Sequence, residues 1–472
     1  MLRTKLVCTL GPASSSPDII HSMVEQGMDM ARINMSHGSH EGHRKAAEAV
    51  RTAAEKVRRP VAILVDLAGP KIRVGDLDEP MELERGETVV MAPMASAKPG
   101  EIPTNYAPLA EEIDEGKSVL LDDGLLELRC VGTDGDRTRL EVVRGGTLKS
   151  RKGINLPNVT VKTPSLTEKD LADLDFALEL GVEYVGLSFV RKASDVIDLK
   201  ERVGGRALVV AKIEKVQALQ VIEEILPETD AVMVARGDLG VELPFERVPL
   251  AQKRIVQLAN YYGRPVITAT QMLESMIEHP RPTRAEASDV ANALLDGSDA
   301  VMLSGETAVG RYPLQALEAL RRIAREIERS GVLERGPRYV TRPGSRARGG
   351  ATAREHAVAA ATVDAARQVS APAIMVVTRS GFTARLVSSY RPPVPVFAVT
   401  TDPSTYRQLS AVWGVHPVLA DVDYVTYEAL TAVGRDAIVH TGEGDRGASV
   451  VVTSGFPFHE SGTTNTMRLE HL

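Results

Sequence analysis

Two short apolar runs in the middle of this sequence end abruptly in charge. Lys212 and Glu214 follow the first run, and Arg236 and Asp238 follow the second. A buried strand cannot hold unpaired charge, and residues two apart on a strand point to the same side. Two carboxylates beside a Lys and an Arg indicate a hard metal ion and an anionic ligand that share one site. Magnesium fits best, because it needs few protein carboxylates; a solvated acidic rim is the alternative.

A second polar cluster, Arg32, Asn34, Ser36 and His37, follows an earlier apolar run. Alternation in an extended segment puts the first three of these side chains on one face. The alternative is a polar turn in which Ser36 or Ser39 caps the next helix.

Three further residues stand where apolar runs end: Asp66 and Arg73 on either side of a Gly-Pro turn, and Thr270 after a later run. Together with Arg32 and Lys212 they provide two guanidiniums and one ammonium around a carboxylate-bound metal. Phosphoryl transfer requires such a set, because its catalysis is mostly positioning and charge neutralisation.

The sequence gives weaker support for a zinc site and none for a common nucleotide-binding loop. His40 and His43 lie three apart, as zinc ligands can, but the start of an exposed helix explains them and no Cys or third ligand is evident nearby. The sequence contains neither a Walker loop nor a GxGxxG fingerprint after a strand, so a nucleotide would have to be held in another way.

The elements that must position these residues are eight short apolar runs, most of them followed by a helical pattern. Eight βα units predict a closed parallel barrel, with the polar clusters at the carboxyl ends of its strands; an open doubly wound sheet is the alternative. The predicted strands are Lys5–Leu10, Asp29–Ile33, Val61–Leu67, Glu183–Phe189, Ala207–Ile213, Asp230–Ala235, Pro265–Thr270 and Asp299–Leu303.

An inserted domain and a C-terminal domain complete the predicted architecture. Residues 71–161 read as a small antiparallel β domain that could swing as a lid over the barrel mouth. A Gly- and Pro-punctuated basic segment, Arg335–Gly350, reads as a solvated linker before an open α/β domain. The predicted bounds are barrel 1–70 and 162–335, lid 71–161, and C-terminal domain 351–472.

Composition limits the function classes. The 472 residues suffice for about three domains, and a formal charge of −7 argues against a nucleic-acid binder. Cys8 and Cys130 lie far apart, so we expect no disulfide framework and a reducing cytoplasm. We see no signal peptide and no membrane span.

Nine segments, in this order and spacing, resemble the pyruvate kinase family over essentially the whole chain. They are Cys8–Ser14 (CTLGPAS), Ala31–Gly38 (ARINMSHG), Asp66–Arg73 (DLAGPKIR), Lys152–Pro157 (KGINLP), Lys212–Glu214 (KIE), Ala235–Gly240 (ARGDLG), Ala269–Met276 (ATQMLESM), Arg281–Glu286 (RPTRAE) and Ser304–Thr307 (SGET). The resemblance implies transfer of the phosphoryl group of phosphoenolpyruvate to ADP, which gives pyruvate and ATP in glycolysis. It also implies a barrel with an inserted lid, a C-terminal regulatory domain and a homotetramer.

The resemblance further implies a role for each residue of the site. Glu214 and Asp238 would ligate magnesium, which manganese can replace. Lys212, Arg32 and Arg73 would neutralise the phosphoryl group, with Lys212 contributing most. The remaining implied roles are substrate binding by Arg32, Lys212, Gly237, Asp238 and Thr270, proton delivery to the enolate at Thr270, and nucleotide binding by Asn34, His37, Arg73 and Lys152.

Many members of the family use a potassium ion, in a pocket matched here by Asn34, Ser36, Asp66 and the carbonyl of Leu67. This sequence departs from the usual pattern there, because Lys71 stands where those members carry a Glu. A tethered ammonium could supply the missing positive charge, so we expect potassium to be dispensable.

The segment Thr378–Thr383 occupies the place of the family's effector loop. Thr378, Ser380, Gly381 and Thr383 would offer hydroxyls and backbone donors to a phosphorylated allosteric effector. An ordinary capped helix is the alternative. For the whole chain, the competing functions are a magnesium-dependent lyase or aldolase acting through a pyruvate enolate, and a catalytically silent metabolite sensor.

Overall fold

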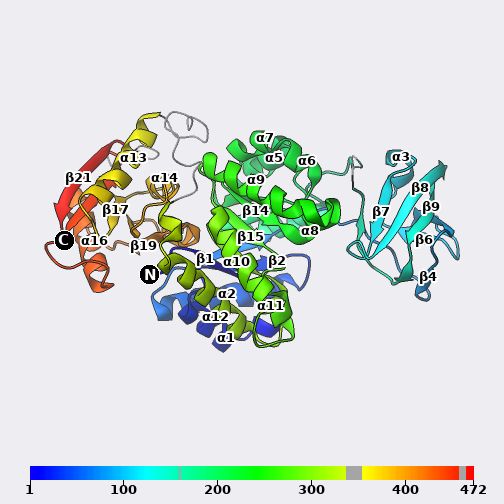
Figure 1. Ribbon diagram of the computed structural model, residues 1–472, viewed down its shortest axis with the longest axis horizontal. Coiled ribbons are helices and arrows are strands. Elements are labelled where there is room, and N and C mark those ends of the chain that lie inside the picture. Colours follow the sequence, from blue (N-terminus) through cyan, green and yellow to red (C-terminus); the bar gives the residue numbers. More distant parts are fainter. Residues whose placement is uncertain (158, 160, 336–352, 457–463) are drawn as a thin grey trace.

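The computed structural model describes residues 1–157, 159, 161–335, 353–456 and 464–472. Figure 1 shows three parts in a row: a C-terminal α/β part, a central barrel and a β part at the opposite end. Among the described residues, eight parallel strands close the barrel in the order β1-β16-β15-β14-β13-β12-β3-β2. The predicted barrel is therefore confirmed, and the open sheet is wrong.

All eight predicted strands form, with ends that differ from the prediction by at most two residues. They are β1 (Lys5–Thr9), β2 (Met30–Asn34), β3 (Ala62–Asp66), β12 (Tyr184–Leu187), β13 (Leu208–Ile213), β14 (Ala231–Ala235), β15 (Val266–Ala269) and β16 (Ala300–Leu303). Alternate residues face opposite ways: Val210 packs in the barrel interior, whereas Val209 and Ala211 pack in the layer that also contains helix residues. This alternation decides which side chains reach the barrel mouth.

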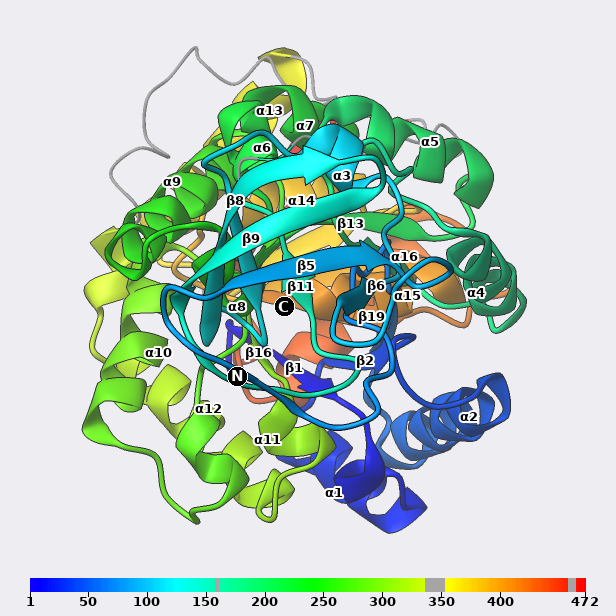
Figure 2. The same cartoon turned by 90° about the vertical axis from the view of Figure 1, so that its right-hand side faces the viewer.

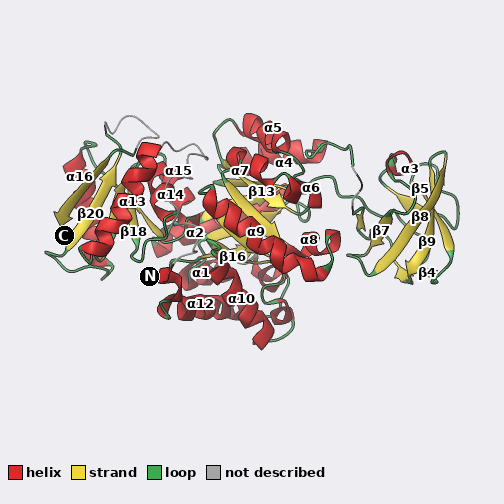
Figure 3. Cartoon of the chain, turned by 45° about the horizontal axis from the view of Figure 1, so that its top comes forward, coloured by secondary structure: helices red, strands yellow, loops and turns green. Residues whose placement is uncertain are grey.

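Helices surround the barrel (Figure 3). The predicted helix Leu314–Ser330 is α12 (Pro313–Arg329). The other barrel helices are α1 (Pro17–Gln26), α2 (His40–Val57), α4 (Glu168–Glu179), α5 (Ala193–Val203), α6 (Val216–Gln220), α7 (Ile222–Glu228), α8 (Arg236–Glu242), α9 (Val248–Tyr261), α10 (Arg284–Asp296) and α11 (Gly305–Ala308). Ser39 caps the start of α2 by accepting a hydrogen bond from the backbone N–H of Gly42, as the capping alternative expected.

The part between β3 and β12 has sheets and a hydrophobic cluster of its own. The larger sheet has the order β11-β7-β8-β9-β5-β6, and β4 pairs with β10. Its pairs are antiparallel except β5 with β6, which corrects the prediction of a purely antiparallel domain. The elements are β4 (Met81–Leu83), β5 (Thr88–Pro93), β6 (Ile102–Thr104), α3 (Leu109–Glu112), β7 (Ser118–Leu121), β8 (Leu126–Asp134), β9 (Arg137–Arg144), β10 (Gly146–Leu148) and β11 (Ile154–Asn155). Seen end-on, its strands lie in front of the barrel (Figure 2).

The C-terminal part is an open sheet in the order β19-β18-β17-β20-β21. The sequence predicts strands at Ala373–Thr378, Val394–Thr400, Pro417–Ala420 and Ala448–Thr453 after a helix at Ala353–Gln368. They appear as β17 (Ile374–Val377), β18 (Val396–Thr400), β19 (Val415–Leu419) and β20 (Ser449–Ser454), and the helix is α13 (Ala353–Gln368). The antiparallel edge strand β21 (Thr466–His471) was not predicted, because its residues are mostly exposed and polar. The other helices are α14 (Phe382–Ser388), α15 (Pro403–Gln408) and α16 (Tyr427–His440).

The C-terminal part packs against the amino-terminal side of the barrel strands through buried polar contacts. Arg391 pairs with Asp299 at 3.0 Å, and the guanidiniums of Arg3 and Arg391 both lie over the ring of Trp413. Residues 336–350 of the predicted linker lie outside the described residues. No helix in the described part of the chain is both long and apolar enough to cross a membrane.

Candidate functional site

Lys212 lies at the centre of a cluster of charged side chains at the carboxyl end of the barrel. It belongs to β13, and the alternation along that strand turns it inward like Val210. Its Nζ lies 3.0 Å from Oδ1 of Asp66 and 2.8 Å from Oε1 of Glu214. Burial alone would lower the pKa of Lys212, but the two carboxylates outweigh it and raise that pKa. Lys212 therefore keeps its positive charge.

Arg32 holds the other side of Asp66. Its Nε and Nη2 lie 2.8 Å and 2.6 Å from Oδ2 of that carboxylate, and its Nη1 donates to Oγ1 of Thr9 at 3.1 Å. Burial would raise the pKa of Asp66, yet Lys212 and Arg32 together hold it below its usual value. Asp66 is thus an ionised carboxylate that orients two cations.

Glu214 is positioned by a strained backbone as well as by Lys212. Its Oε2 accepts a hydrogen bond from the N–H of Phe189 at 2.9 Å, and Phe189 has a φ of 58°. A bulky residue in the left-handed region is uncommon and is typical of functional sites. Burial raises the pKa of Glu214; Lys212 lowers it and Asp238 raises it, and the balance is a raised pKa.

Asp238 lies in the first turn of α8 and is exposed. Since it and Glu214 repel each other, a divalent cation between them would relieve that repulsion, so the pair fits magnesium, which takes one or two protein carboxylates. Within the described ranges, no three or more His, Cys, Asp and Glu side chains are grouped as metal ligands. Water and substrate oxygens would complete such a site.

Thr270 and Gly237 meet across two neighbouring strand ends. The N–H of Gly237 donates to Oγ1 of Thr270 at 2.7 Å, and this hydroxyl donates to the carbonyl of Ala269 at 2.6 Å. The structure thus brings Thr270 into contact with Gly237 at the start of α8, and Gly237 directly precedes Asp238.

Three residues of the predicted monovalent-cation pocket, Asn34, Asp66 and Leu67, already use oxygens for partners within the protein. Oδ1 of Asn34 accepts the N–H of Ser36 at 3.1 Å, and the carbonyl of Leu67 accepts the hydroxyl of Ser188 at 2.6 Å. The ammonium in contact with Asp66 is that of Lys212, not that of Lys71.

Lys71 is solvent-exposed but lies within the electrostatic reach of the cluster. Desolvation by the surrounding protein and the charge of Lys212 lower its pKa, while Asp238 and Glu214 oppose that shift. His37 is also exposed, and its pKa is lowered by desolvation, then by Lys71 and the two nearby arginines. The mouth therefore carries a concentration of positive charge.

Arg73 and Lys152 both belong to the inserted part. Nη1 of Arg73 donates to the carbonyl of Arg151 at 3.3 Å, and Nζ of Lys152 lies 2.8 Å from Oδ1 of Asp122. The structure does not bring either side chain into contact with the Lys212 cluster. Both lie on the inserted part, which faces the mouth of the barrel.

The two histidines of the zinc alternative have ordinary partners. Nε2 of His40 lies 2.7 Å from Oδ1 of Asp173, with its ring stacked on Phe176, and Nε2 of His43 lies 2.8 Å from the carbonyl of His37. They are explained as structural residues at the start of α2.

In the C-terminal part, the predicted effector residues form a turn that leads into α14. The N–H of Gly381 donates to Oγ1 of Thr378 at 3.0 Å, the carbonyl of Ser380 accepts from Nη2 of Arg385, and Thr383 and Thr464 share a hydrogen bond at 2.8 Å. These contacts hold the turn in shape, and no side chain among the described residues caps the start of α14 at Gly381.

Sequence reasoning missed Ser188 and Phe189. The hydroxyl of Ser188 accepts a hydrogen bond from Nζ of Lys212 at 2.8 Å and ties it to the carbonyl of Leu67, while the backbone of Phe189 holds Glu214. The available signal is their place at a strand exit, since the exits of five other strands, β2, β3, β13, β14 and β15, carry the polar residues on which the predicted site rests.

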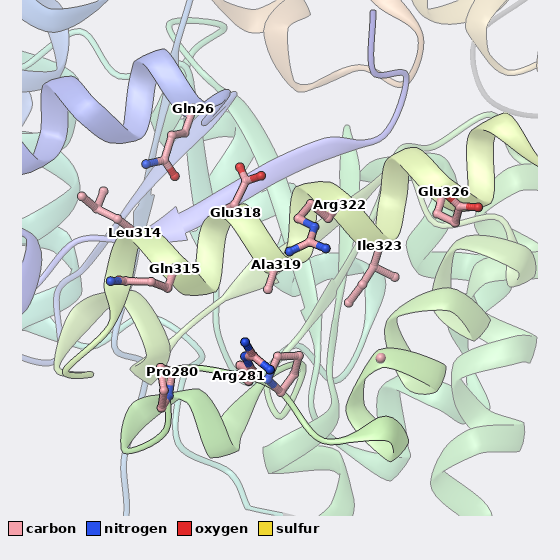
Figure 4. Close-up of a pocket in the computed structure, with 12 residues that line it drawn as sticks. Gln26, Pro280, Arg281, Leu314, Gln315, Glu318, Ala319, Arg322, Ile323 and Glu326 are labelled. Carbon is pink, nitrogen blue, oxygen red and sulfur yellow. The ribbon is translucent and has the colours of Figure 1, made fainter.

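A groove of about 960 Å³ lies elsewhere on the barrel, between α12 and the segment that contains Arg281 (Figure 4). Arg322 on α12 and Arg281 on the facing segment lie on opposite sides of it. None of the predicted site residues lines this groove, so it is separate from the cluster around Lys212.

Comparison with known proteins agrees with this geometry. Residues 1–317 match the model "Pyruvate kinase, barrel domain", and residues 356–470 match "Pyruvate kinase, alpha/beta domain". The chain is 43% identical to a pyruvate kinase of Geobacillus stearothermophilus over 479 residues and 42% identical to one of Staphylococcus aureus (strain MRSA252) over 476 residues. Each comparison covers 99% of this chain and 80% of the relative. The chain belongs to the pyruvate kinase family.

Proposed function

We propose that Lys212 is the central catalytic group of this member of the pyruvate kinase family, which transfers the phosphoryl group of phosphoenolpyruvate to ADP and forms pyruvate and ATP. The contacts of its ammonium with Asp66 and Glu214 support the proposal, because they fix a buried positive charge beside the pair of carboxylates suited to a metal. A fixed charge in a site of low dielectric stabilises a transferring phosphoryl group without reorganisation.

Glu214 and Asp238 would hold the magnesium ion, with manganese as a substitute. When bound, the metal supplies positive charge to the oxygens of phosphoenolpyruvate. The chain's own part is to orient Glu214 through the N–H of Phe189 and to keep Asp238 at the start of α8.

Arg32 and Arg73 would neutralise the phosphoryl group together with Lys212. Arg32 is held by Asp66 and Thr9, which supports a fixed role. Arg73 belongs to the inserted part, so its contribution would depend on closure of that part as a lid. The guanidinium of Arg32 would thus be in place before the lid closes, whereas that of Arg73 would reach the site only on closure.

The backbone of Gly237 and the side chain of Asp238 would contact the substrate's carboxylate end, and Thr270 would deliver the proton to the enolate. Its hydroxyl is fixed by two hydrogen bonds, to Gly237 and Ala269, which supports a role in placing a proton. Asn34, His37, Arg73 and Lys152 would bind the nucleotide, and the positive charge around His37 suits its phosphates.

Potassium would be dispensable in this chain. The oxygens of Asp66 and Leu67 that would otherwise hold it already interact with Arg32, Lys212 and Ser188. The ammonium of Lys71 adds a further positive charge near Glu214 and Asp238. Both observations support the expectation that no added monovalent cation is needed.

A homotetramer and a phosphorylated effector at Thr378, Ser380, Gly381 and Thr383 complete the proposal. The edge strand β21 exposes Leu469 and Met467 and leaves one side of its backbone free among the described strands, so it can pair with a second copy. A tetramer of two-fold symmetric dimers needs a second contact surface besides this strand. We also propose the domain bounds 1–70, 71–161, 162–335 and 351–472, and a cytoplasmic location.

One assay separates the candidate functions. ATP formation that requires phosphoenolpyruvate, ADP and magnesium is the expected result. Carbon–carbon cleavage without ADP would favour the lyase or aldolase, for which neither the comparisons nor the geometry provides support, and no turnover at all would favour the sensor. Sugar phosphates and AMP, added one at a time, test the effector through the half-saturating concentration of phosphoenolpyruvate.

A further inference from the structure

Two consecutive residues at the exit of β15 have left-handed backbone conformations. Thr270 has a φ of 64° and Gln271 a φ of 54°. Such conformations are unfavourable, above all for a β-branched residue, and persist only where the surroundings impose them. Something in the structure must therefore hold this pair.

The side chain of Arg236 makes the contacts that hold both residues. Its Nε and Nη2 donate to the carbonyl of Thr270 at 3.1 Å and 2.7 Å, and Nη2 also donates to the carbonyl of Gln271 at 3.0 Å. A planar guanidinium presents its N–H groups in a fixed fork, so the two carbonyls must point to a common place. That requirement fits the left-handed turn between them.

The guanidinium is itself fixed from the outside of the barrel. Its Nη1 lies 2.6 Å from Oδ2 of Asp289 on α10 and 3.4 Å from Oε1 of Gln252 on α9. The Arg236 residue is only 7% exposed, so its charge is paired mainly with Asp289 rather than with solvent. Arg236 thus connects two barrel helices to the loop after β15.

The residue after Arg236 fixes the hydroxyl of the same threonine. The N–H of Gly237 donates to Oγ1 of Thr270, while Arg236 holds the Thr270 carbonyl. Two adjacent residues therefore set both the backbone and the side chain of Thr270. A displacement of about 1 Å at a reacting group can cost on the order of 100-fold in rate, so this control matters.

We propose that Arg236, with Asp289 as its charge partner, is a positioning residue that sets the Thr270 hydroxyl for proton delivery to the enolate. The inference rests on the proposed role of Thr270. Arg236 does not act on the substrate; it acts through the carbonyls of Thr270 and Gln271.

The decisive variant is Arg236→Lys, which keeps the positive charge but loses the fork. We expect kcat to fall at least about tenfold, with the KM for phosphoenolpyruvate changed by less than about threefold. Exchange of the methyl protons of pyruvate with solvent, which isolates the proton-transfer step, should fall in parallel. A merely structural role would lower neither kcat nor this exchange at a temperature where the variant is folded.

The matched control is Arg264→Lys. Nε and Nη2 of Arg264 donate to the carbonyls of Leu226 and Pro227 at 2.9 Å and 2.7 Å, in the same kind of fork, just before the opposite end of β15. We expect Arg264→Lys to lower the melting temperature and to leave kcat and proton exchange unchanged.

A double-mutant cycle with Thr270→Val completes the test. If Arg236 acts through Thr270, the double variant should be no slower than Thr270→Val alone. Losses that multiply, or wild-type turnover in Arg236→Lys, would overturn the inference. Wild-type proton exchange in Thr270→Val would overturn the proposed role of Thr270 itself, and the inference with it.

If Arg236→Lys does not fold, Asp289→Asn replaces it in the same double-mutant cycle. We expect a smaller loss of kcat from Asp289→Asn, and the same outcomes would support or overturn the inference.

Discussion

The backbone N–H of Phe189 donates to Oε2 of Glu214 across the ends of neighbouring strands β12 and β13, at 2.9 Å. Phe189 presents this N–H from a left-handed backbone conformation, with a φ of 58°. With Lys212 on Oε1, both oxygens of the carboxylate have one fixed partner and keep lone pairs for a metal. Local strain in one strand end thus orients a carboxylate of the next.

Glu214→Gln should raise the magnesium concentration for half-maximal activity by roughly 10- to 100-fold or more, since an amide keeps the size of the side chain but removes its charge. Titration of activity with magnesium measures this. Glu242→Gln is the matched control, because Glu242 is also buried and pairs with Lys215 at 2.5 Å, outside the proposed metal pair. An unchanged magnesium requirement in Glu214→Gln would rule out Glu214 as a ligand.

Lys212→Met should lower kcat by at least about 10²–10³-fold, the range for loss of one group that stabilises the transition state. The variant also leaves Asp66 and Glu214 buried without their common cation, so we expect a lower melting temperature. Steady-state kinetics with a parallel thermal melt separate the two effects at a temperature where the variant is folded. Near-normal turnover would remove Lys212 from the proposed mechanism.

Lys71→Met should make activity depend on potassium. The wild-type chain is expected to turn over equally in KCl and in a tetraalkylammonium chloride. The variant lacks one positive charge near Glu214 and Asp238, so its rate should fall in the tetraalkylammonium salt and recover in KCl. Lys45→Met serves as the control, since Lys45 forms an exposed ion pair with Glu41 on α2. A wild-type enzyme that needs KCl would contradict the Lys71 argument.

The barrel could be predicted from the sequence because each strand is a short apolar run that ends in polar residues, and eight such runs define a closed parallel sheet. The alternation along β13 similarly places Lys212 and Glu214 on one side. Strand β21 could not be predicted because an edge strand lacks a neighbour on one side and does not need a continuous apolar run. Its two large apolar residues, Met467 and Leu469, alternate with polar residues and are exposed.

The side-chain contacts between strand ends could not be predicted from the sequence. The pattern indicates that Asp66 and Lys212 lie at the same end of the barrel, but not that their side chains touch, because that depends on register and rotamers. The positions of Phe189 and Thr270 depend on positive φ values, which no local preference of Phe or Thr predicts. The backbone conformations of these two residues depart from the local preferences of their residue types, as is common at functional sites.

Leu469→Lys should reduce the size of the assembly. Leu469 is 57% exposed on the edge strand β21, and a charge there would oppose pairing with the same strand of a second copy. Light scattering coupled to size-exclusion chromatography gives the mass. Leu125→Lys is the control, because Leu125 is 68% exposed on the inserted part. A wild-type chain that is already monomeric would contradict the tetramer, and an unchanged tetramer in Leu469→Lys would exclude β21 as a contact.

His416 should make the C-terminal part less stable in mild acid. Burial, Lys5, the N-terminal ammonium and Arg59 together lower its pKa well below the usual value of 6.5. As the pH falls below about 6.5, the unfolded chain binds a proton that folded His416 does not, so the free energy of unfolding decreases by up to about 1.4 kcal/mol per pH unit. The decrease ends only when folded His416 itself becomes protonated. Chemical denaturation of the wild type and of His416→Gln between pH 5 and pH 8 measures the difference, and the variant should lose less stability on acidification. Equal slopes in the two proteins would show that His416 does not contribute.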